Sequence, residues 1–529
     1  MTLPVQVSPK HKVVGVPDAP ALRNLFPTAP QIVSGGRPHL VIPHRPVETF
    51  MLRKLGYDVP APILTQYDWP HPAGEPPFDA QKRTAALLTM NDRAYVLSGM
   101  GTGKTRSALW SWDYLNKAGL AGKLLVFAPL STLTFTWQRE VFNLLPHRKS
   151  VVLHGTKKKR LERLAEDVDI YIINHDGLGV LLPEVMARTD ITALVIDELA
   201  VYRNGTAERT KKLRKLTAAP HVKWVWGMTG SPMPNAPTDV WAQAAIVTPS
   251  RVPKYFTAFR NELMLKVSQF KYVPRSDAVE RAFEALQPSV RFTLDDVYEL
   301  PETIYRSLDV ELGKQQAKVY KDMADKCFAA VQNHQITAAN AGAVMSKLLQ
   351  VSTGWVYTAD HRTVPLDNQK RVEALMDAIN STDRKVIVFV PYKHALAGIS
   401  EALTSEGYEH AAVSGDTPAG ERSQIFNAFQ NTSKYKVLAA HPQCLAHGIT
   451  LTAADTIIWF APITSLETYE QANARISRVG QKHKQLVLHL QSTPVEARIY
   501  SMLKGKQRVQ DKLLDLFATA TSEGNHENS

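Results

Sequence analysis

Short apolar runs alternate with amphipathic stretches between residues 78 and about 250. Apolar runs bounded by turn residues are typical of strands that are buried on both faces of a sheet. The stretches between them repeat apolar positions at helical spacing, as Ala108, Leu109, Trp112 and Leu115 do. This alternation predicts a parallel α/β sheet with right-handed crossovers. The expected strands are 94–97, 124–127, 151–153, 170–173, 193–196 and one that begins over 222–226.

A second α/β rhythm occupies residues 366–520. Its expected strands are 386–390, one that ends at Val413, 437–440, 456–460 and 486–490. Between the two rhythms, over residues 251–365, the strand pattern stops and apolar residues recur at helical spacing. We therefore expect a helical insert there. It carries a basic face, either solvated or turned to nucleic acid, that comprises Lys254, Arg260, Lys266 and Lys271.

The two ends of the chain differ from its centre. Residues 1–77 hold 15 of the 33 prolines, a density that argues for irregular or edge structure. One strand over Leu40–Ile42 and one short helix over Val47–Leu55 fit this segment, which we expect to be a small accessory module or an ordered arm. The tail, residues 521–529, is polar and expected to be disordered.

Composition and charge narrow the choice of class. The chain has 529 residues, of which 44% are hydrophobic, so two or more domains with buried cores are expected. Its net charge of +12 and pI of about 9.4 favour a polyanionic partner, although solubility alone could explain the excess. Two cysteines, Cys327 and Cys444, exclude a disulfide framework and a cysteine zinc cluster. With no apolar signal core and no long apolar run, we expect a soluble cytoplasmic protein.

The stretch Ser98–Thr105, SGMGTGKT, carries the most specific chemistry. It lies between an expected strand and an expected helix, which is the context that a phosphate-binding loop needs. Gly101 and Gly103 let the backbone approach an anion, and the N–H groups that open the helix point at it. Lys104 would reach the β and γ phosphates of ATP, and the Thr105 hydroxyl would hold Mg²⁺. The alternative, a glycine turn that merely caps a helix, explains less of this context.

Two flanking groups extend this prediction. Phe78 and Gln81, about twenty residues upstream, could stack on adenine and read its edge, or could simply begin a helix. Ser131 and Thr132 follow a strand end and could contact a nucleic-acid phosphate. An ordinary helix cap explains that second pair about equally well.

Two carboxylates end the strand 193–196. Asp197 at this strand tip would hold Mg²⁺ together with Thr105, and Glu198 would orient and deprotonate the attacking water. Downstream, Thr229 and Ser231 belong to a T-G-S-P turn at the next strand tip. Their hydroxyls could link the nucleotide site to nucleic acid.

The second α/β half lacks a phosphate loop but has QANARISRVGQ at 471–481. A helix over 466–478 would place Gln471, Arg475 and Arg478 on one face, at i, i+4 and i+7. Two arginines there could reach a triphosphate across a cleft, and an arginine finger contributes about 10³ to 10⁵ in rate. Surface salt bridges, worth less than about 1 kcal/mol each, are the alternative.

In this order, the motifs resemble those of superfamily 2 helicases and translocases, most closely the Swi/Snf-type DNA-dependent ATPases. The resemblance runs from about Phe78 to Tyr500, and the spacing of the late motifs is similar to that of short bacteriophage forms. The matching pieces are PFDAQ, SGMGTGKT, LLVFAPLSTLTFTW, VIDELAVYRN, GMTGSPMPN, VFVPY, VSGD, GITLTAADTIIWF and QANARISRVGQ.

The resemblance implies two RecA-like lobes with ATP and Mg²⁺ between them. It implies movement along one strand of duplex DNA, held mainly through phosphates. It extends the nucleotide loop to Met100 and Thr102 and adds Ser414 and Thr450 as nucleic-acid candidates. If the chain is of bacteriophage origin, it would act in the host cytoplasm.

Some family positions are occupied by other residues. Ala200 stands where the family usually has a His that couples hydrolysis to the DNA site. Leu445 and Ala446 replace a glycine pair, Thr450 replaces an Asn, and Ser98 replaces an acidic residue. The phosphate, metal and water-activating groups are retained, so the doubt falls on coupling and not on hydrolysis.

Four functional hypotheses follow. The first is a DNA-dependent ATPase that translocates on duplex DNA, and its near neighbour is a strand-separating helicase of replication, recombination or repair. A third is a DNA-binding scaffold that uses ATP only as a clamp, for which Ala200 is the motive. An RNA substrate is the fourth, because RNA offers a similar phosphate track.

Overall fold

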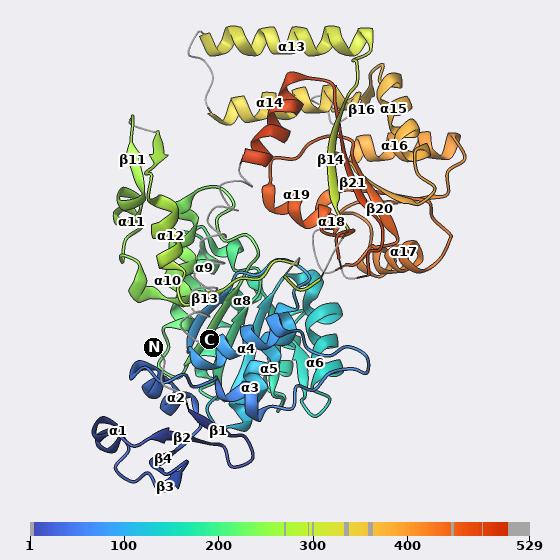
Figure 1. Cartoon of the computed structure of the whole chain (residues 1–529). Coiled ribbons are helices and arrows are strands. Elements are labelled where there is room, and N and C mark those ends of the chain that lie inside the picture. Colours follow the sequence, from blue (N-terminus) through green and yellow to red (C-terminus); the bar gives the residue numbers. More distant parts are fainter. Residues whose placement is uncertain are drawn as a thin grey trace. The chain divides into compact units, whose positions relative to one another are not determined.

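Two parallel β-sheets organise the chain, one in each of two structural units, Met1–Val297 and Tyr298–Val509 (Figure 1). The computed structural model describes residues 5–268, 271–294, 296–298, 301–332, 338–357, 363–445, 449–478 and 480–505. The tail expected over 521–529 therefore lies outside the described residues. The two-lobed α/β fold expected from the apolar runs is confirmed.

The first sheet has seven strands, all parallel, in the order β13-β5-β10-β9-β6-β8-β7. Each expected strand is present, with bounds that differ by a few residues, because long apolar runs must be buried on both faces. The strands are β5 (Arg93–Val96), β6 (Lys123–Ala128), β7 (Ser150–Val152), β8 (Ile170–Asn174), β9 (Ile191–Ile196), β10 (Trp224–Met228) and β13 (Ser289–Val290).

Helices cover both faces of this sheet. On β9, Ala193 and Val195 point into one core and Leu194 and Ile196 into the other, the period of two expected of a strand. The first core is completed by α4 (Asp79–Met90), α5 (Lys104–Lys117) and α6 (Arg139–Leu144). The second is completed by α7 (Lys157–Leu164), α8 (Leu178–Ala187), α9 (Glu208–Thr217) and α10 (Val240–Val247).

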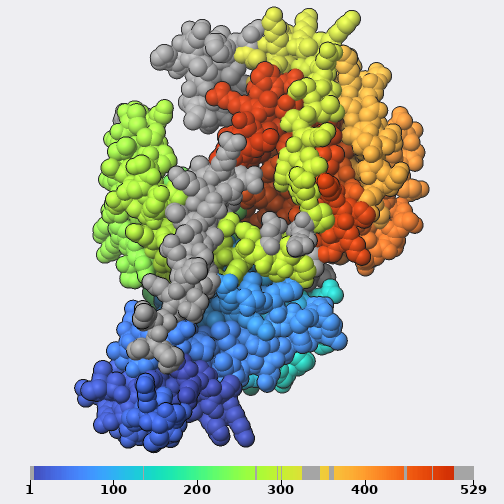
Figure 2. Space-filling model, in the orientation of Figure 1, coloured from blue at the N-terminus to red at the C-terminus, as the bar shows by residue number. Residues whose placement is uncertain are grey.

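Residues 5–59 form a small N-terminal module with a core of its own (dark blue in Figures 1 and 2). An antiparallel sheet, ordered β1-β2-β4-β3, packs against two helices. The strand and the helix expected here are both present. The elements are β1 (Gln6–Ser8), β2 (Val13–Pro17), α1 (Pro20–Leu25), β3 (Gln31–Ser34), β4 (Arg37–Pro43) and α2 (Pro46–Lys54).

The residues after this module belong to the core of the first sheet. They include α3 (Pro62–Gln66), followed by Tyr67 and Trp69, which are buried beside α5. The Tyr67 hydroxyl donates to the buried Asp113 carboxylate at 2.7 Å. The Pro-rich segment is thus an ordered part of the first unit, and we call residues 61–297 lobe 1.

The helical insert expected over 251–365 contains strands as well as helices. Helices α11 (Phe256–Leu263), α12 (Ala278–Ala285), α13 (Lys314–Gln332) and α14 (Ala338–Thr353) are present, but β13 adds to the first sheet and β14 (Thr303–Asp309) adds to the second. Strand β13 has only two residues, and β14 lies at a sheet edge with exposed side chains, so neither produces a buried-strand pattern. The hairpins β11 (Met264–Lys266)–β12 (Tyr272–Pro274) and β15 (Trp355–Tyr357)–β16 (Thr363–Pro365) also fall in this interval.

The second unit, lobe 2, contains six parallel strands in the order β14-β21-β20-β17-β19-β18. Its other strands match the expected ones: β17 (Lys385–Phe389), β18 (His410–Val413), β19 (Val437–Ala440), β20 (Ala454–Trp459) and β21 (Gln485–Gln491). Its helices are α13 (Lys314–Gln332), α14 (Ala338–Thr353), α15 (Gln369–Asn380), α16 (Lys393–Ser405), α17 (Ala419–Asn431), α18 (Pro442–Leu445) and α19 (Leu466–Asn473).

Lobe 2 also buries both faces of its sheet. Along β17, Ile387 and Phe389 enter a core shared with α17 and α19, and Val386 and Val388 enter a core shared with α15 and α16. Among the helices in the described part of the chain, none combines the length and apolar character needed to cross a membrane.

Candidate nucleotide and nucleic-acid site

The loop between β5 and α5 has the geometry of an anion cradle. Gly101 and Gly103 have φ of +83° and +81°, in the left-handed region where an L-residue costs about 1–2 kcal/mol. Gly103 precedes the first residue of α5, whose free N–H groups and dipole favour an anion. The Lys104 ammonium donates to the loop's own carbonyls, Ser98 at 2.7 Å and Gly99 at 3.2 Å. A phosphate would replace these carbonyls as the partner of that ammonium.

Gln81 joins this loop to the start of α4. Its side chain is buried, and its Oε1 accepts from the Phe78 N–H at 2.9 Å. Its Nε2 lies so close to the loop that a Cβ added at Gly103 would be 1.8 Å from this nitrogen. Gln81 therefore caps a helix, as the plainer alternative held, and also contacts the phosphate loop.

A segment that the sequence did not single out runs along the same loop. Residues 288–292 pair with β5 and continue past it, so that the Gly99 N–H donates to the Phe292 carbonyl at 2.8 Å. The Ser98 hydroxyl, which stands where the family has a carboxylate, accepts from the Phe292 N–H at 3.0 Å. Leu294 would meet a Cβ at Gly101 at 3.2 Å. A hydroxyl at position 98 thus has a structural use.

Asp197 follows β9 directly and is held by two donors. The Trp137 indole N–H donates to its Oδ2 at 2.9 Å, and the Glu198 N–H donates to its Oδ1 at 3.1 Å. Burial raises the pKa of the Asp197 carboxyl, against the opposing influence of Trp137 and of the nearby Lys104 ammonium. A cation at this carboxylate would offset the cost of burying its charge.

The donors suit Mg²⁺. The Thr105 hydroxyl and the Asp197 carboxylate are hard oxygen ligands, and Mg²⁺ is usually held by one or two protein oxygens together with nucleotide phosphates and water. Within the described ranges, no three His, Cys, Asp or Glu side chains gather into a metal centre independent of the nucleotide. The fit therefore depends on ATP being bound at the same time.

Glu198 has an unusual backbone. Its φ of +51° and ψ of +51° are left-handed, a conformation that is costly for a residue other than glycine. The 3₁₀ turn that follows, η4 (Leu199–Tyr202), is almost wholly buried, and this packing holds the turn in place. Ala200 is fully buried in it. The Tyr202 hydroxyl hydrogen-bonds His175 Nδ1 at 3.1 Å.

The T-G-S-P turn after β10 lies beside the phosphate loop. A Cβ at Gly230 would be 4.0 Å from Lys104 Nζ. The Thr229 hydroxyl is buried and accepts from the Ser231 N–H at 3.2 Å, so it stabilises the turn itself. The structure thus brings together, within lobe 1, the loop, Gln81 and this turn.

Ser131 and Thr132 lie in the 3₁₀ turn η1 (Leu130–Thr132) after β6. Ser131 is exposed, whereas the Thr132 hydroxyl donates to the Pro129 carbonyl at 2.9 Å. Thr132 therefore has the local role of a turn-stabilising residue, and Ser131 is the one whose side chain is open to solvent. The chain then continues as a π-helix, η2 (Leu133–Gln138), into α6.

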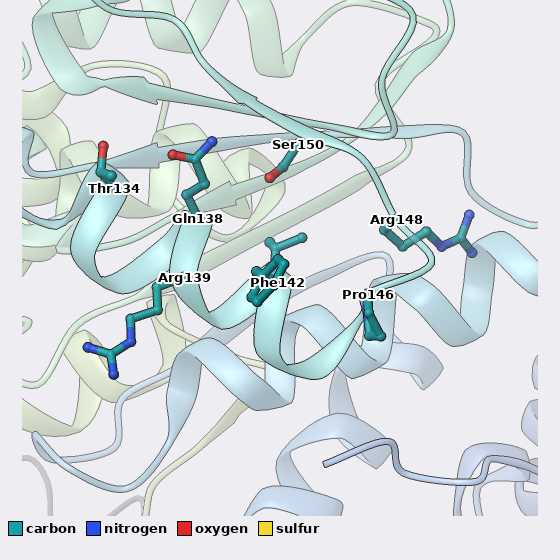
Figure 3. Close-up of a pocket in the computed structure, with 8 residues that line it drawn as sticks. Thr134, Gln138, Arg139, Phe142, Pro146, Arg148 and Ser150 are labelled. Atoms are coloured by element: carbon teal, nitrogen blue, oxygen red, sulfur yellow. The ribbon is translucent and has the colours of Figure 1, made fainter. Parts of the chain in front are cut away.

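A hollow of about 520 Å³ opens beside this π-helix (Figure 3). Figure 3 shows Thr134 and Gln138 on the same helical segment, with Phe142 and Pro146 further along the chain. Phe142 is 76% exposed. No residue predicted to bind nucleotide is among those that line the described hollow: Thr134, Gln138, Arg139, Val141, Phe142, Pro146, Arg148 and Ser150.

The helix expected over 466–478 is shorter than predicted. Helix α19 ends at Asn473, because the Arg475 side chain takes the Gln471 carbonyl (Nε–O 2.7 Å) that would otherwise accept a backbone N–H. Arg475 is 1% exposed and also donates to the Ile449 carbonyl at 3.0 Å. The three residues predicted to share a helical face, Gln471, Arg475 and Arg478, therefore do not lie on one continuous helix.

The remaining lobe 2 candidates have local partners. Arg478 donates to the Thr450 hydroxyl at 3.3 Å and to the Ala474 carbonyl at 3.2 Å. The Ser414 hydroxyl accepts from the Asp416 N–H at 3.2 Å, at the carboxyl end of β18. Leu445, one of the two residues in place of the glycine pair, is fully buried, and Ala446 lies outside the described residues.

The SNF2-related domain matches residues 87–357, just over half of the chain, and the helicase conserved C-terminal domain matches residues 370–480.

The chain belongs to the SNF2-related family.

It is accordingly an ATP-hydrolysing enzyme of the helicase and translocase group, as its motifs predicted.

Individual relatives are distant. Protein p41 of Acyrthosiphon pisum secondary endosymbiont phage 1 is 26% identical over 449 residues, which cover 80% of this chain and 94% of p41. An uncharacterized ATP-dependent helicase of Mycoplasma genitalium is 23% identical, over 78% of this chain and 40% of its own length. The ISWI chromatin-remodeling complex ATPase of Saccharomyces cerevisiae is 23% identical, over 81% and 39%. The chain thus spans nearly all of the phage protein but about two fifths of the other two.

Solved structures of SWI2/SNF2 ATPase cores are similar over most of the chain. The Sulfolobus solfataricus SWI2/SNF2 ATPase core in complex with dsDNA is 20% identical, with a TM-score of 0.39, over 86% of this chain and 97% of that chain.

Proposed function

We propose that this protein is a DNA-dependent ATPase that converts ATP hydrolysis into translocation along duplex DNA. The observation that carries the proposal is the convergence, at the carboxyl edge of the lobe 1 sheet, of Gly103, Lys104 and the T-G-S-P turn, with the Asp197 carboxylate within electrostatic range of Lys104. Together with membership of the SNF2-related family, this convergence supports ATP as the substrate.

Each residue then has a role in hydrolysis. The loop Met100–Thr105 would hold the phosphates, and Phe78 and Gln81 would contact adenine. Thr105 and Asp197 would hold Mg²⁺, which neutralises charge on the β and γ phosphates when it is bound. Glu198 would orient the water and accept its proton. From lobe 2, Arg478 would stabilise charge on the transferred phosphoryl group, and Gln471 would assist it.

The observed contacts change the role of one arginine. Arg475 is buried and donates to the carbonyls of residues 471 and 449. We therefore assign it to holding the segment that carries Arg478 against the loop before β20, to which Ile449 belongs. Arg478, which contacts a threonine hydroxyl and one carbonyl, is the better candidate for the phosphates.

DNA would be held through phosphates, by Ser131 in lobe 1 and by Ser414 and Thr450 in lobe 2, with Thr132, Thr229 and Ser231 shaping the turns. The net charge of +12 supports a polyanionic partner. Binding of this kind is largely independent of sequence and weakens steeply with salt.

Displacement of a triplex-forming strand tests translocation directly. A third strand bound to duplex DNA should be released in the presence of ATP by the wild-type protein and retained by Glu198→Gln. Release of a labelled strand from forked DNA, with the triplex left intact, would instead identify a strand-separating helicase. Tight ATP-dependent DNA binding with neither product would identify a scaffold.

A further inference from the structure

Trp137 makes a contact that the roles proposed above for the site residues do not explain. It is fully buried, and its indole N–H donates to Asp197 Oδ2 at 2.9 Å. The two residues are 60 positions apart. They meet because β6 and β9 are neighbours in the sheet, with Phe127 opposite Ile196, so the chain that leaves β6 passes the end of β9.

This contact differs from those of other tryptophans in the same lobe. Five of them donate the indole N–H to a backbone carbonyl, as Trp112 does to Gly122 at 2.9 Å. Trp137 donates to a carboxylate, and a hydrogen bond to an ionised acceptor is about twice as strong as one between neutral groups. The bond fixes one oxygen of a group expected to hold Mg²⁺.

Trp137 also lies close in the chain to the turn that is expected to contact nucleic acid. It lies on the π-helix η2, directly after the turn that carries Ser131 and Thr132. Single turns of π-helix are uncommon and occur frequently at functional sites. Because η2 follows the 131–132 turn directly and carries Trp137, a displacement of that turn would be transmitted through one helical turn and the indole hydrogen bond to the Asp197 carboxylate.

We propose that Trp137 is a positioning residue that couples the nucleic-acid-facing turn after β6 to the Mg²⁺ ligand Asp197. The inference rests on the proposed function of this site. It also supplies a route of communication that needs no side chain at position 200, where the buried Ala200 has no hydrogen-bonding group.

The test replaces the N–H and keeps the ring. In Trp137→Phe, and in a variant with 3-benzothienylalanine at position 137, the donor is lost while an aromatic group remains. Groups that orient a metal ligand typically contribute about 10- to 100-fold in metal affinity or activity. We expect the Mg²⁺ concentration for half-maximal ATPase activity to rise about tenfold and the stimulation by duplex DNA to fall about tenfold.

Trp112→Phe is the matched control, since Trp112 is equally buried and loses a bond of the same length to a carbonyl. The melting temperatures of all variants distinguish a variant that has lost its fold from one in which only the Asp197 carboxylate is no longer held in position. Two quantities are compared with those of Trp112→Phe: the Mg²⁺ concentration for half-maximal ATPase activity and the stimulation by duplex DNA. The inference is overturned if, for both position-137 variants, one of these quantities equals that of Trp112→Phe.

Failure of the proposed function has a different signature. If wild-type ATPase activity did not respond to DNA at all, the translocase proposal would fail. The Mg²⁺ dependence of binding of a fluorescent ATP analogue would still show whether Trp137 positions Asp197, and an unchanged dependence would overturn that part as well.

Discussion

Replacing Gly103 by alanine should remove Gln81 from its place beside the phosphate loop. A Cβ at Gly103 would lie 1.8 Å from Gln81 Nε2 and 2.9 Å from its Cδ, so the amide must move away. Gln81, whose side chain is only 2% exposed, would then lose the hydrogen bond of 2.9 Å that its Oε1 accepts from the Phe78 N–H. The loop and the start of α4 would separate.

The magnitude follows from two contributions. Alanine at φ of +81° costs about 1–2 kcal/mol. Leaving a buried hydrogen-bonding group without its partner costs about 1–3 kcal/mol more. We expect Gly103→Ala to lower the free energy of unfolding of lobe 1 by about 2–5 kcal/mol.

Gly101→Ala is the matched control. Its φ of +83° gives the same backbone cost, but its Cβ would meet only the flexible end of Leu294, at 3.2 Å. It should cost about 1–2 kcal/mol. In a Gln81→Ala background, the loss of stability caused by Gly103→Ala should fall to that of Gly101→Ala. The difference between its cost in the wild-type and in the Gln81→Ala background is the coupling free energy of the Gly103–Gln81 contact.

Two assays measure this effect. Urea unfolding of the full chain gives the stability of lobe 1 from the transition that ATP shifts to higher denaturant. Titration with a fluorescent ATP analogue gives the affinity, which should fall at least about tenfold more for Gly103→Ala than for Gly101→Ala, corresponding to about 1.4 kcal/mol. Equal effects of the two variants, or no rescue in the Gln81→Ala background, would refute the reasoning.

Four further predictions concern both lobes. Glu198→Gln should abolish turnover and leave ATP binding intact, as single-turnover and binding assays would show; residual turnover near the wild-type rate would exclude Glu198 as the base. Arg478→Ala should lower the rate about 10³-fold or more with an unchanged melting temperature, and a loss below about tenfold would contradict its role. By contrast, Arg475→Ala should lower the stability of lobe 2 by about 2–6 kcal/mol, because two carbonyls lose their donor. Burial lowers the pKa of His489, whose Nε2 bonds the Tyr469 hydroxyl at 2.8 Å, to about 3. This pKa is below that of a histidine in the unfolded chain. The contribution of the buried, neutral His489 to the free energy of unfolding is therefore present above about pH 6.5 and is lost as the pH falls. Lobe 2 should lose about 2 kcal/mol between pH 7 and 5, and a flat urea profile over that range would contradict it.

The sequence predicted the parts of the fold that are locally encoded. Long apolar runs such as Leu124–Phe127 must be strands, and Gly101 and Gly103 of the phosphate loop adopt left-handed conformations that glycine reaches at little cost. The short strand Ser289–Val290 and the exposed edge strand Thr303–Asp309 have no such signature, since their pairing with distant strands determines them.

The candidate site divides in the same way. The loop, its lysine and the strand-tip carboxylates could be found from spacing, because each depends on a few neighbouring residues. The Trp137–Asp197 bond could not, because it depends on which strands are neighbours in the sheet. The early end of α19 could not either, since a side chain that bonds the Ile449 carbonyl, far away in sequence, competes for the helical carbonyl at 471. The Trp in LLVFAPLSTLTFTW was the available signal: a large residue with one donor must find a partner when it is buried.

The rate of ATP hydrolysis, compared across no nucleic acid, single-stranded DNA, duplex DNA, forked DNA and RNA, is the measurement that tests the central claim most directly. We predict that duplex DNA raises the rate well above that without nucleic acid and above that with RNA, and that Glu198→Gln is inactive throughout. A rate that is the same in every condition, or that never exceeds background, would contradict a DNA-dependent motor.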